Sequence, residues 1–370
     1  MSQVKISEEI ALDKIESAFQ TFWRETSEAG SDEAVLKAGT LNLIILLSEK
    51  SLYDELIADM HEIVKSHPGR IIIVYLSPEG DSSDIKAQTS AILHKAKEQT
   101  QICAELVVLQ TGYAGSVHLA GTILPLLLAD LPVYFWCTSL DALMNPQVKI
   151  LLQFTDRLIV STPPEYETAQ ELTRTIDTIL AFDSECKISD TSWSRLTEWR
   201  ESIAQFFDAD KSMEYLSHLQ EVEIIYAGDK LSNDSFLMAG WLSSSLTSAA
   251  RRMSIQNDST IYFGRRKEQL AIKIRKKNID GRAGLQKIKL YTEENGKTVI
   301  LTATAIDGCI QTTAQQGGSR LSRNYCRITG KNRAEMLCIE LDFLQQDRIY
   351  LNTCRVISEY LHENATQNIS

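Results

Sequence analysis

The strongest chemical feature of this sequence is a cluster of cationic side chains in its second half. Residues 251–289 hold twelve Lys or Arg and three Asp or Glu, although the whole chain has a formal net charge of −11. Lys273, Arg275 and Lys277 alternate along an expected strand and therefore share one face. Such a row can bind carboxylates or phosphates of a partner. The alternative is a solvated sheet face whose charges discourage aggregation.

A second candidate is a glycine-containing turn that precedes an expected helix. The sequence Gly-Tyr-Ala-Gly-Ser spans residues 112–116. Backbone amides at a helix start can hold an anion, so Gly112, Gly115 and Ser116 are candidate anion-binding residues. The alternative is an ordinary turn followed by a helix cap.

Motifs for catalysis, metals and cofactors are missing from the sequence. It contains no G-x-x-x-x-G-K-[ST], G-x-G-x-x-G or G-x-S-x-G pattern, and its six His form no i, i+4 pair. No His lies near a Cys at zinc spacing. Cys137 follows an apolar run and could be a nucleophile, but a lone Cys there is more often a small buried hydrophobe. We therefore expect no enzyme activity, no cofactor and no metal.

Composition sets the class of protein and its expected compartment. A chain of 370 residues exceeds the roughly 250–300 residues that one hydrophobic core usually serves, so two domains are expected. The acidic balance argues against binding to nucleic acids or to anionic membranes. The seven Cys are odd in number and form no C-x-x-C pair, which favours reduced thiols in a cytoplasm. The first residues do not read as a signal peptide, and the longest apolar region, 119–137, is broken by Pro125, Asp130 and Pro132.

The first half of the chain alternates between strand and helix patterns. Apolar runs predict strands at 40–47, 70–76, 101–110, 132–136 and 157–161, with an edge position as one option for 101–110. Helical spacing predicts helices at 6–25, 51–66, 116–128, 145–154 and 166–182. Residues 87–99 have mixed polarity and no clear pattern. We therefore predict an α/β domain over residues 1–183, with a mostly parallel sheet and flanking helices.

The second half changes to a strand period of two residues. Helices are predicted at 193–208, 233–246, 333–346 and 348–363, and strands at 222–226, 270–275, 287–291 and 298–305. The Glu294-Asn295-Gly296 segment predicts a hairpin turn, because Asn-Gly accepts positive φ at low cost. Residues 184–370 are therefore predicted to form a smaller α+β domain with an antiparallel sheet.

Three ordered stretches resemble one protein family. They are ILPLLLADLPVYFW at 123–136, WSRLTEWRESIAQFFD at 193–208 and LMAGWLSSSL at 237–246, with DRLIV at 156–160 between the first two. The HPGRI segment at 67–71 also matches the family's turn before a strand. Together they resemble the OpcA family, the bacterial assembly and activation proteins of glucose-6-phosphate dehydrogenase. One departure is Cys137, since family members often carry paired tryptophans at this strand end.

The resemblance implies a non-catalytic partner of glucose-6-phosphate dehydrogenase, the enzyme that commits glucose 6-phosphate to the oxidative pentose phosphate pathway. Relatives promote the active oligomer of the dehydrogenase or raise its apparent substrate affinity. The apolar face of 193–206 would then be either an internal interface between domains or a surface for the partner. The partner-binding candidates are Trp193, Arg195, Trp199, Arg200, Lys273, Arg275 and Lys277.

Two other functions stay open at this point. The chain could be an enzyme or sensor that binds a sugar phosphate through the 112–116 turn or the basic strands. It could also be a scaffold that binds nucleic acid, although aromatic residues are few near the basic segment.

Overall fold

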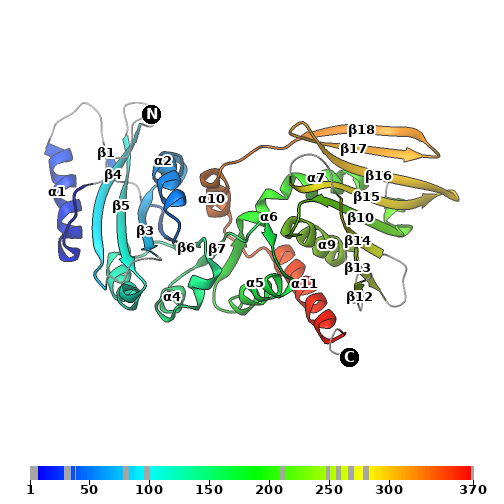
Figure 1. Cartoon of the computed structure of the whole chain (residues 1–370). Helices are drawn as coiled ribbons and strands as arrows, with labels where there is room; N and C mark the ends of the chain where they lie inside the picture. The colour runs from blue at the N-terminus through cyan, green and yellow to red at the C-terminus, as the bar shows by residue number, and fades with distance from the viewer. Residues whose placement is uncertain are drawn as a thin grey trace. The chain divides into compact units, whose positions relative to one another are not determined.

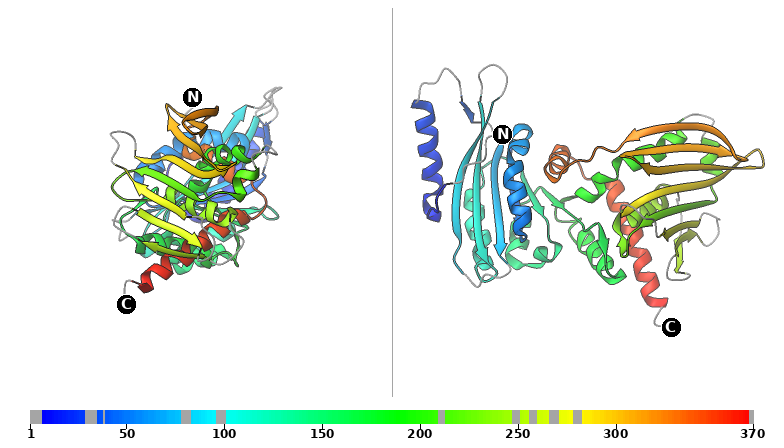
Figure 2. Two further views of the ribbon diagram at one scale, coloured as in Figure 1. Left: turned by 90° about the vertical axis from the view of Figure 1, so that its right-hand side faces the viewer. Right: turned by 45° about the horizontal axis from the view of Figure 1, so that its top comes forward.

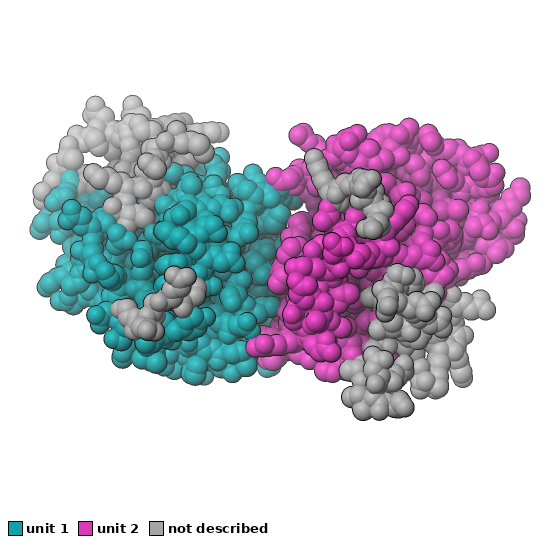
Figure 3. Space-filling model, viewed as in Figure 1, with its two compact units in different colours: residues 1–161, 182–191, 331–346 teal, residues 162–181, 192–330, 347–370 magenta. Residues whose placement is uncertain are grey.

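The chain forms two compact units, each built from three segments (Figure 3). Unit 1 contains 1–161, 182–191 and 331–346, and unit 2 contains the remaining residues. The computed structural model describes residues 7–28, 35–37, 39–77, 83–95, 101–208, 213–246, 251–255, 260–265, 271–277 and 283–367. The boundary expected after residue 183 stays a prediction, and these units differ from it because 162–181 joins unit 2 and 331–346 joins unit 1.

Unit 1 is built on a sheet whose strand order is β1-β5-β3-β2-β6-β7-β9. All neighbours along this path run parallel, and β4 pairs with β5 in the antiparallel direction. The strands are β1 (Val35–Lys37), β2 (Leu41–Leu47), β3 (Gly69–Ser77), β4 (Lys86–Lys95), β5 (Gln101–Gly112), β6 (Val133–Cys137), β7 (Arg157–Val160) and β9 (Lys187–Asp190).

The strand order of unit 1 is that of a doubly wound, Rossmann-type sheet. Taken along the chain, β2, β3, β5, β6, β7 and β9 lie in the spatial order 3-2-1-4-5-6, and the order reverses between β2 and β6. β2 and β6 are buried along their whole length, which explains their continuous apolar runs. The predicted mostly parallel α/β fold is confirmed.

Helices cover both faces of this sheet (Figure 1). The face toward α2 forms an apolar core in which Leu43, Ile45, Met60, Ile63 and Leu337 are fully buried. Leu337 comes from α10, which packs against α2 although it lies near the C-terminal end of the sequence. The helices are η1 (Leu12–Lys14), α1 (Ile15–Glu28), α2 (Lys50–Ser66), η2 (Ala114–His118), α3 (Leu119–Ile123), η3 (Leu124–Leu126), η4 (Leu140–Met144), α4 (Pro146–Leu152) and α10 (Arg333–Asp342).

Unit 2 is built on an eight-stranded sheet with the order β12-β13-β14-β10-β15-β16-β17-β18. All neighbouring strands are antiparallel except β10 and β14, so the predicted antiparallel sheet is confirmed with one parallel pair. Its strands are β10 (Glu221–Ala227), β12 (Arg251–Ile255), β13 (Thr260–Arg265), β14 (Ala271–Lys276), β15 (Gly284–Glu294), β16 (Lys297–Ile306), β17 (Cys309–Gln316) and β18 (Ser319–Arg327). Asn295 and Gly296 form the β15–β16 turn with φ of 51° and 72°, as the sequence predicts.

The described helices of unit 2 gather on one face of this sheet (Figures 1 and 2). Ile272, Ile274, Ile288 and Leu290 point to that face and are buried, because α9 packs on β10, β14 and β15. We call the opposite side the outer face. The remaining elements are β8 (Glu165–Tyr166), α5 (Ala169–Ala181), α6 (Thr191–Arg195), α7 (Thr197–Ala204), η5 (Gln205–Phe207), α8 (Met213–Ser217), β11 (Leu231–Ser232), α9 (Asn233–Leu246) and α11 (Arg348–Gln367).

Several predicted elements need correction. Residues 101–112 form β5, an interior strand paired with β1, β3 and β4, and 86–95 form β4 where the sequence shows no clear pattern. The helix predicted at 116–128 is broken into η2, α3 and η3, with Pro125 inside η3. The helix predicted at 193–208 is divided into α6, α7 and η5, and the break between α6 and α7 lies at Leu196, which has φ −90° and ψ 3°.

Candidate functional site

The tryptophan face predicted at 193–206 is largely buried inside unit 2. Trp193, Leu196, Trp199 and Ile203 are each no more than 6% exposed. The Trp193 indole Nε1 donates a 2.8 Å hydrogen bond to Asp347. These side chains belong to the packing of the unit, since buried Trp nitrogen usually requires such an acceptor. A direct contact with a partner stays a prediction for Trp193 and Trp199.

The two arginines of the same stretch also have internal partners. The Arg200 guanidinium lies 3.6 Å from the centroid of the Trp193 ring and donates a 2.7 Å hydrogen bond to the Trp193 carbonyl. Arg195 forms a 2.7 Å ion pair with Asp234 at the start of α9. Partner binding through Arg195 or Arg200 stays a prediction, and any partner would compete with these contacts.

The basic strands lie side by side on the outer face. The sheet register places Lys273 of β14 and Lys289 of β15 directly opposite Glu223 of β10. Lys289 and Arg275 each form an ion pair with Glu223, at 2.8 Å and 3.0 Å, and Lys273 pairs with Glu221 at 2.5 Å. The alternation predicted for this segment therefore brings several cations to one sheet face.

On this part of the outer face, cationic side chains of β14 and β15 outnumber the carboxylates of β10. Burial alone would raise the pKa of Glu223, but the hydrogen bond from Lys289 and the charges of Lys289 and Arg275 lower it. Partial burial and the nearby charges of Lys289 and Lys277 lower the pKa of Lys287. Lys277 follows β14 and is exposed. We call Lys273, Arg275, Lys277, Lys287 and Lys289 the basic patch; Glu221 and Glu223 are the carboxylates paired with it.

Gly115 and Ser116 of the 112–116 turn contact other residues of the chain. A Cβ on Gly115 would lie 1.9 Å from Thr111 Oγ1 and 2.9 Å from the Ser83 carbonyl oxygen. The Ser116 amide donates to the Tyr113 carbonyl at 3.1 Å, and the Ser116 hydroxyl accepts from Asn145 Nδ2 at 3.0 Å. Gly115 is therefore explained by close packing, and an anion site at Gly112, Gly115 and Ser116 stays a prediction.

The strand order of unit 1 reverses between β2 and β6, so the ligand position typical of doubly wound sheets would lie at the carboxyl ends of these two strands. Doubly wound proteins often bind ligands there, with glycines in the first turn that let the backbone approach a pyrophosphate. Here the turn between β2 and α2 is Ser48-Glu49, without glycine and with a carboxylate at the helix start. Thr138 also donates from its amide to the Leu46 carbonyl at 3.2 Å, which extends the pairing of β2 and β6 by one residue. The residues present do not fit a dinucleotide phosphate.

The candidate nucleophiles lack an activating base among the described residues. Cys137 is fully buried, and desolvation raises the pKa of its thiol to about 12.

A cluster of Ser358, Asp177 and His362 lies in unit 2. Both Ser358 Oγ and His362 Nε2 contact Asp177, at 2.8 Å each. Because the carboxylate lies between them, the His is not placed to accept a proton from the Ser. Within the described ranges no three His, Cys, Asp or Glu side chains could hold a metal ion.

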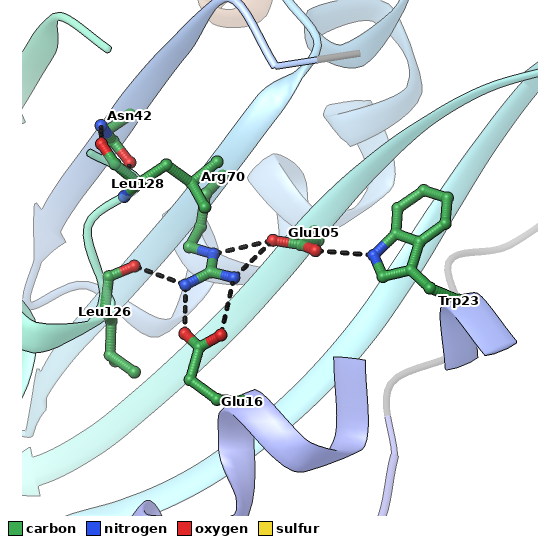
Figure 4. A network of polar contacts seen from close by, with 7 residues as sticks. All are labelled: Glu16, Trp23, Asn42, Arg70, Glu105, Leu126 and Leu128. Carbon is green, nitrogen blue, oxygen red and sulfur yellow. Dashed lines mark hydrogen bonds and ion pairs between the residues drawn. The ribbon is translucent and has the colours of Figure 1, made fainter. Parts of the chain in front are cut away.

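Unit 1 contains a buried ion network that was not predicted from the sequence (Figure 4). Arg70 donates from Nε and Nη2 to Glu105 at 2.8 Å and 2.6 Å, and it also pairs with Glu16 of α1. Trp23 of α1 donates to the other oxygen of Glu105 at 2.8 Å. Burial alone would lower the pKa of Arg70, but the two carboxylates raise it. The network fixes α1 to β3 and β5, and the Arg in the HPGRI segment is the local signal for it.

Two family profiles match most of the chain. The profile described as the glucose-6-phosphate dehydrogenase subunit N-terminal domain matches residues 60–175. The profile described as the C-terminal domain of the same subunit matches residues 186–354.

Curated relatives carry a consistent name. An OxPP cycle protein OpcA from Nostoc punctiforme is 29% identical over 187 residues, which is 50% of this chain and 39% of the relative. An OxPP cycle protein OpcA from Synechocystis is 27% identical over 235 residues, covering 63% of this chain and 46% of the relative. The matches therefore span less than half the length of these relatives.

Solved structures show only a distant likeness. An oxidoreductase from Parabacteroides merdae has a TM-score of 0.48 at 9% identity, covering 90% of this chain and 99% of that one. The WlbA dehydrogenase from Thermus thermophilus has a TM-score of 0.41 at 8% identity, covering 86% and 94%. Scores this low support no argument about activity. Among the described helices, none has the length and apolar character needed to cross a bilayer.

Proposed function

We propose that this chain, which belongs to the OpcA family of glucose-6-phosphate dehydrogenase subunits, is a non-catalytic regulator that binds the dehydrogenase and promotes its active oligomeric state. Family membership rests on profiles that match residues 60–175 and 186–354. The curated relatives carry the name of a protein of the oxidative pentose phosphate cycle. The role places the chain in that pathway as a binding protein of the cytoplasm.

The observation that carries the proposal is the basic patch on the outer face of unit 2. The five cations of the patch face two carboxylates, in a chain whose formal net charge is −11. Partial burial and then the charges of Lys289 and Lys277 lower the pKa of Lys287, so bringing a carboxylate close to this amine would stabilise its charged form. An acidic surface of the dehydrogenase would supply such carboxylates and would be steered toward the patch over a long range.

Activation requires a difference in affinity between two states of the dehydrogenase. The chain shifts the enzyme only if it binds the active oligomer more tightly than the inactive form. Coupling of about 1–3 kcal/mol corresponds to roughly 5–150-fold in apparent affinity. By reciprocity, a ligand that stabilises the same active state of the enzyme would tighten binding of this chain.

The test combines binding with charge reversal. Purified chain and dehydrogenase should co-elute in gel filtration, and Arg275→Glu with Lys277→Glu should weaken binding more at low salt than at high salt. Lys65→Glu with Lys149→Glu is the matched control, because both are exposed lysines on helices α2 and α4 of unit 1. Failure of the wild-type chain to bind would contradict the function. Equal binding by the charge-reversed and control variants would contradict the patch as the docking surface.

Calorimetry separates this function from direct recognition of a sugar phosphate. We expect glucose 6-phosphate and 6-phosphogluconate to give no binding heat with the chain alone. Tight binding of either compound without the dehydrogenase would instead support a metabolite sensor.

A further inference from the structure

β18 is an edge strand with no neighbour on its outer side among the described residues (Figure 1). It runs from Ser319 to Arg327, is nine residues long and pairs only with β17. All its residues are exposed except Cys326, which is partly buried. Half of the backbone N–H and C=O groups of such a strand point away from the sheet and can bond to a further strand.

The hairpin formed by β17 and β18 is cationic without compensating acids. Residues 308–331 contain Arg320, Arg323, Arg327 and Lys331 but no Asp or Glu. The register pairs Arg320, Arg323 and Arg327 with Gln315, Thr313 and Cys309 of β17, so the three arginines share the outer face. No ion pair joins these arginines to a carboxylate within the described part of the chain.

Apolar surface accompanies these charges. Leu321 is 52% exposed and Tyr325 is 58% exposed on the same strand. The Arg323 guanidinium lies 5.0 Å from the Tyr325 ring centroid. Large side chains left half-exposed beside an open strand edge are typical of surfaces that accept an extended segment.

Charge decides which segment fits. If a second copy of the chain added its β18 in antiparallel register about Arg323, arginines from both copies would lie on one sheet face. Such like-charge pairs are unfavourable, so the arginines protect the edge against self-association. The same side chains would pair with carboxylates that alternate along an incoming strand.

We propose that β18 binds an extended acidic segment of a partner protein by strand addition. The segment would form a ninth strand of the unit 2 sheet, with backbone hydrogen bonds to β18 and carboxylates opposite Arg320, Arg323 and Arg327. This inference goes beyond the proposed function, because it does not require the dehydrogenase to supply the segment.

The test uses a short, fluorescently labelled synthetic peptide of alternating glutamate and valine, with the full-length chain. We expect the peptide to bind and to slow amide hydrogen exchange in residues 319–327, whereas a lysine and valine peptide does not bind. Arg320→Glu, Arg323→Glu and Arg327→Glu together should weaken binding by at least about tenfold. The matched control is Lys65→Glu, Lys149→Glu and Lys297→Glu, which should bind as the wild type does.

A change in the peptide backbone distinguishes strand addition from simple charge attraction, because only strand addition needs the peptide's backbone N–H groups. A glutamate and valine peptide with alternate amides N-methylated keeps its charge but loses half of its backbone donors. We expect its binding to be lost. Equal binding of the methylated peptide, protection outside 319–327, or no binding of the unmodified peptide to the wild-type chain would each overturn the proposal, and none of these results depends on the dehydrogenase.

Discussion

Arg200 stacks on Trp193 with 3.6 Å between its guanidinium carbon and the ring centroid, and it also donates to the Trp193 carbonyl. The 193–208 stretch, one of the three that resemble the family, therefore contains a packing motif within unit 2. Gly240 in the third family stretch has a similar explanation, because a Cβ there would lie 2.8 Å from Ile357 of α11. These contacts stabilise the unit that carries the outer face.

Replacing Trp193 with Ala should strongly destabilise the chain. The substitution removes a buried ring and leaves Asp347 without its indole donor, so we expect a loss of about 3–5 kcal/mol in unfolding free energy. Urea unfolding followed by circular dichroism measures this loss. Tyr113→Ala is the control, since Tyr113 is 58% exposed and its removal should change stability by about 0.5 kcal/mol or less. Similar effects of the two substitutions would contradict the packing role.

Removing one partner of the buried Arg70–Glu105 ion pair should lower the free energy of unfolding more than replacing both partners with apolar residues. Both side chains of the Arg70–Glu105 pair are 3% exposed, so Arg70→Met leaves a buried carboxylate and should lower stability by about 3–5 kcal/mol. The double variant Arg70→Met with Glu105→Leu should recover part of this loss. A double-mutant cycle in urea checks the prediction, and simple additivity of the two single losses would contradict it.

Glu223 should make stability depend on acid pH. Its pKa is lower in the folded chain than in the unfolded chain, so its contribution is fully present above the unfolded value of about 4.3 and is lost as pH falls through the folded value. We expect the stability difference between wild type and Glu223→Gln to be constant near neutral pH and to shrink in acid. A difference that stays constant to pH values well below the unfolded pKa, or grows in acid, would refute this assignment.

Cys137 should be inert in the native chain. Its thiol is fully buried with a pKa of about 12, and burial also raises the pKa of Cys186 and Cys338 to about 11. Because the thiolate is the reactive form, iodoacetamide at pH 8 should leave Cys137 unmodified until urea is added. Mass spectrometry of the peptides reads the modification. Rapid labelling of Cys137 in native protein would reopen its role as a nucleophile.

Local apolar patterns were enough to predict most of the strands. β2, β3, β6 and β7 lie within two residues of their predicted bounds, because strands buried on both faces have continuous apolar runs. β4 was not predicted because its residues have mixed polarity. It pairs with β5 on one side and has only an isolated bridge to Ile10 on the other. The break at Leu196 also lacks a Gly or Pro signal in the sequence.

Contacts between distant residues could not be predicted. Arg70 meets Glu105 across 35 positions, and Trp193 meets Asp347 across 154. Periodicity describes which face of an element is apolar, but it does not say which element covers that face. The basic row was visible because alternation alone places Lys273 and Arg275 together, whereas its carboxylate partners on β10 required the sheet register.

One assay tests the proposed function most directly. The rate of glucose-6-phosphate dehydrogenase is measured over a range of glucose 6-phosphate concentrations with no added chain, with wild-type chain and with the Arg275→Glu, Lys277→Glu variant, and its oligomeric state is followed in parallel by gel filtration. We expect the wild-type chain to lower the half-saturating concentration or raise the maximal rate, and to shift the enzyme to a larger complex. At low salt, the variant should change the kinetics less and should shift less of the enzyme to the larger complex. Unchanged kinetics and unchanged elution with saturating wild-type chain would contradict the account.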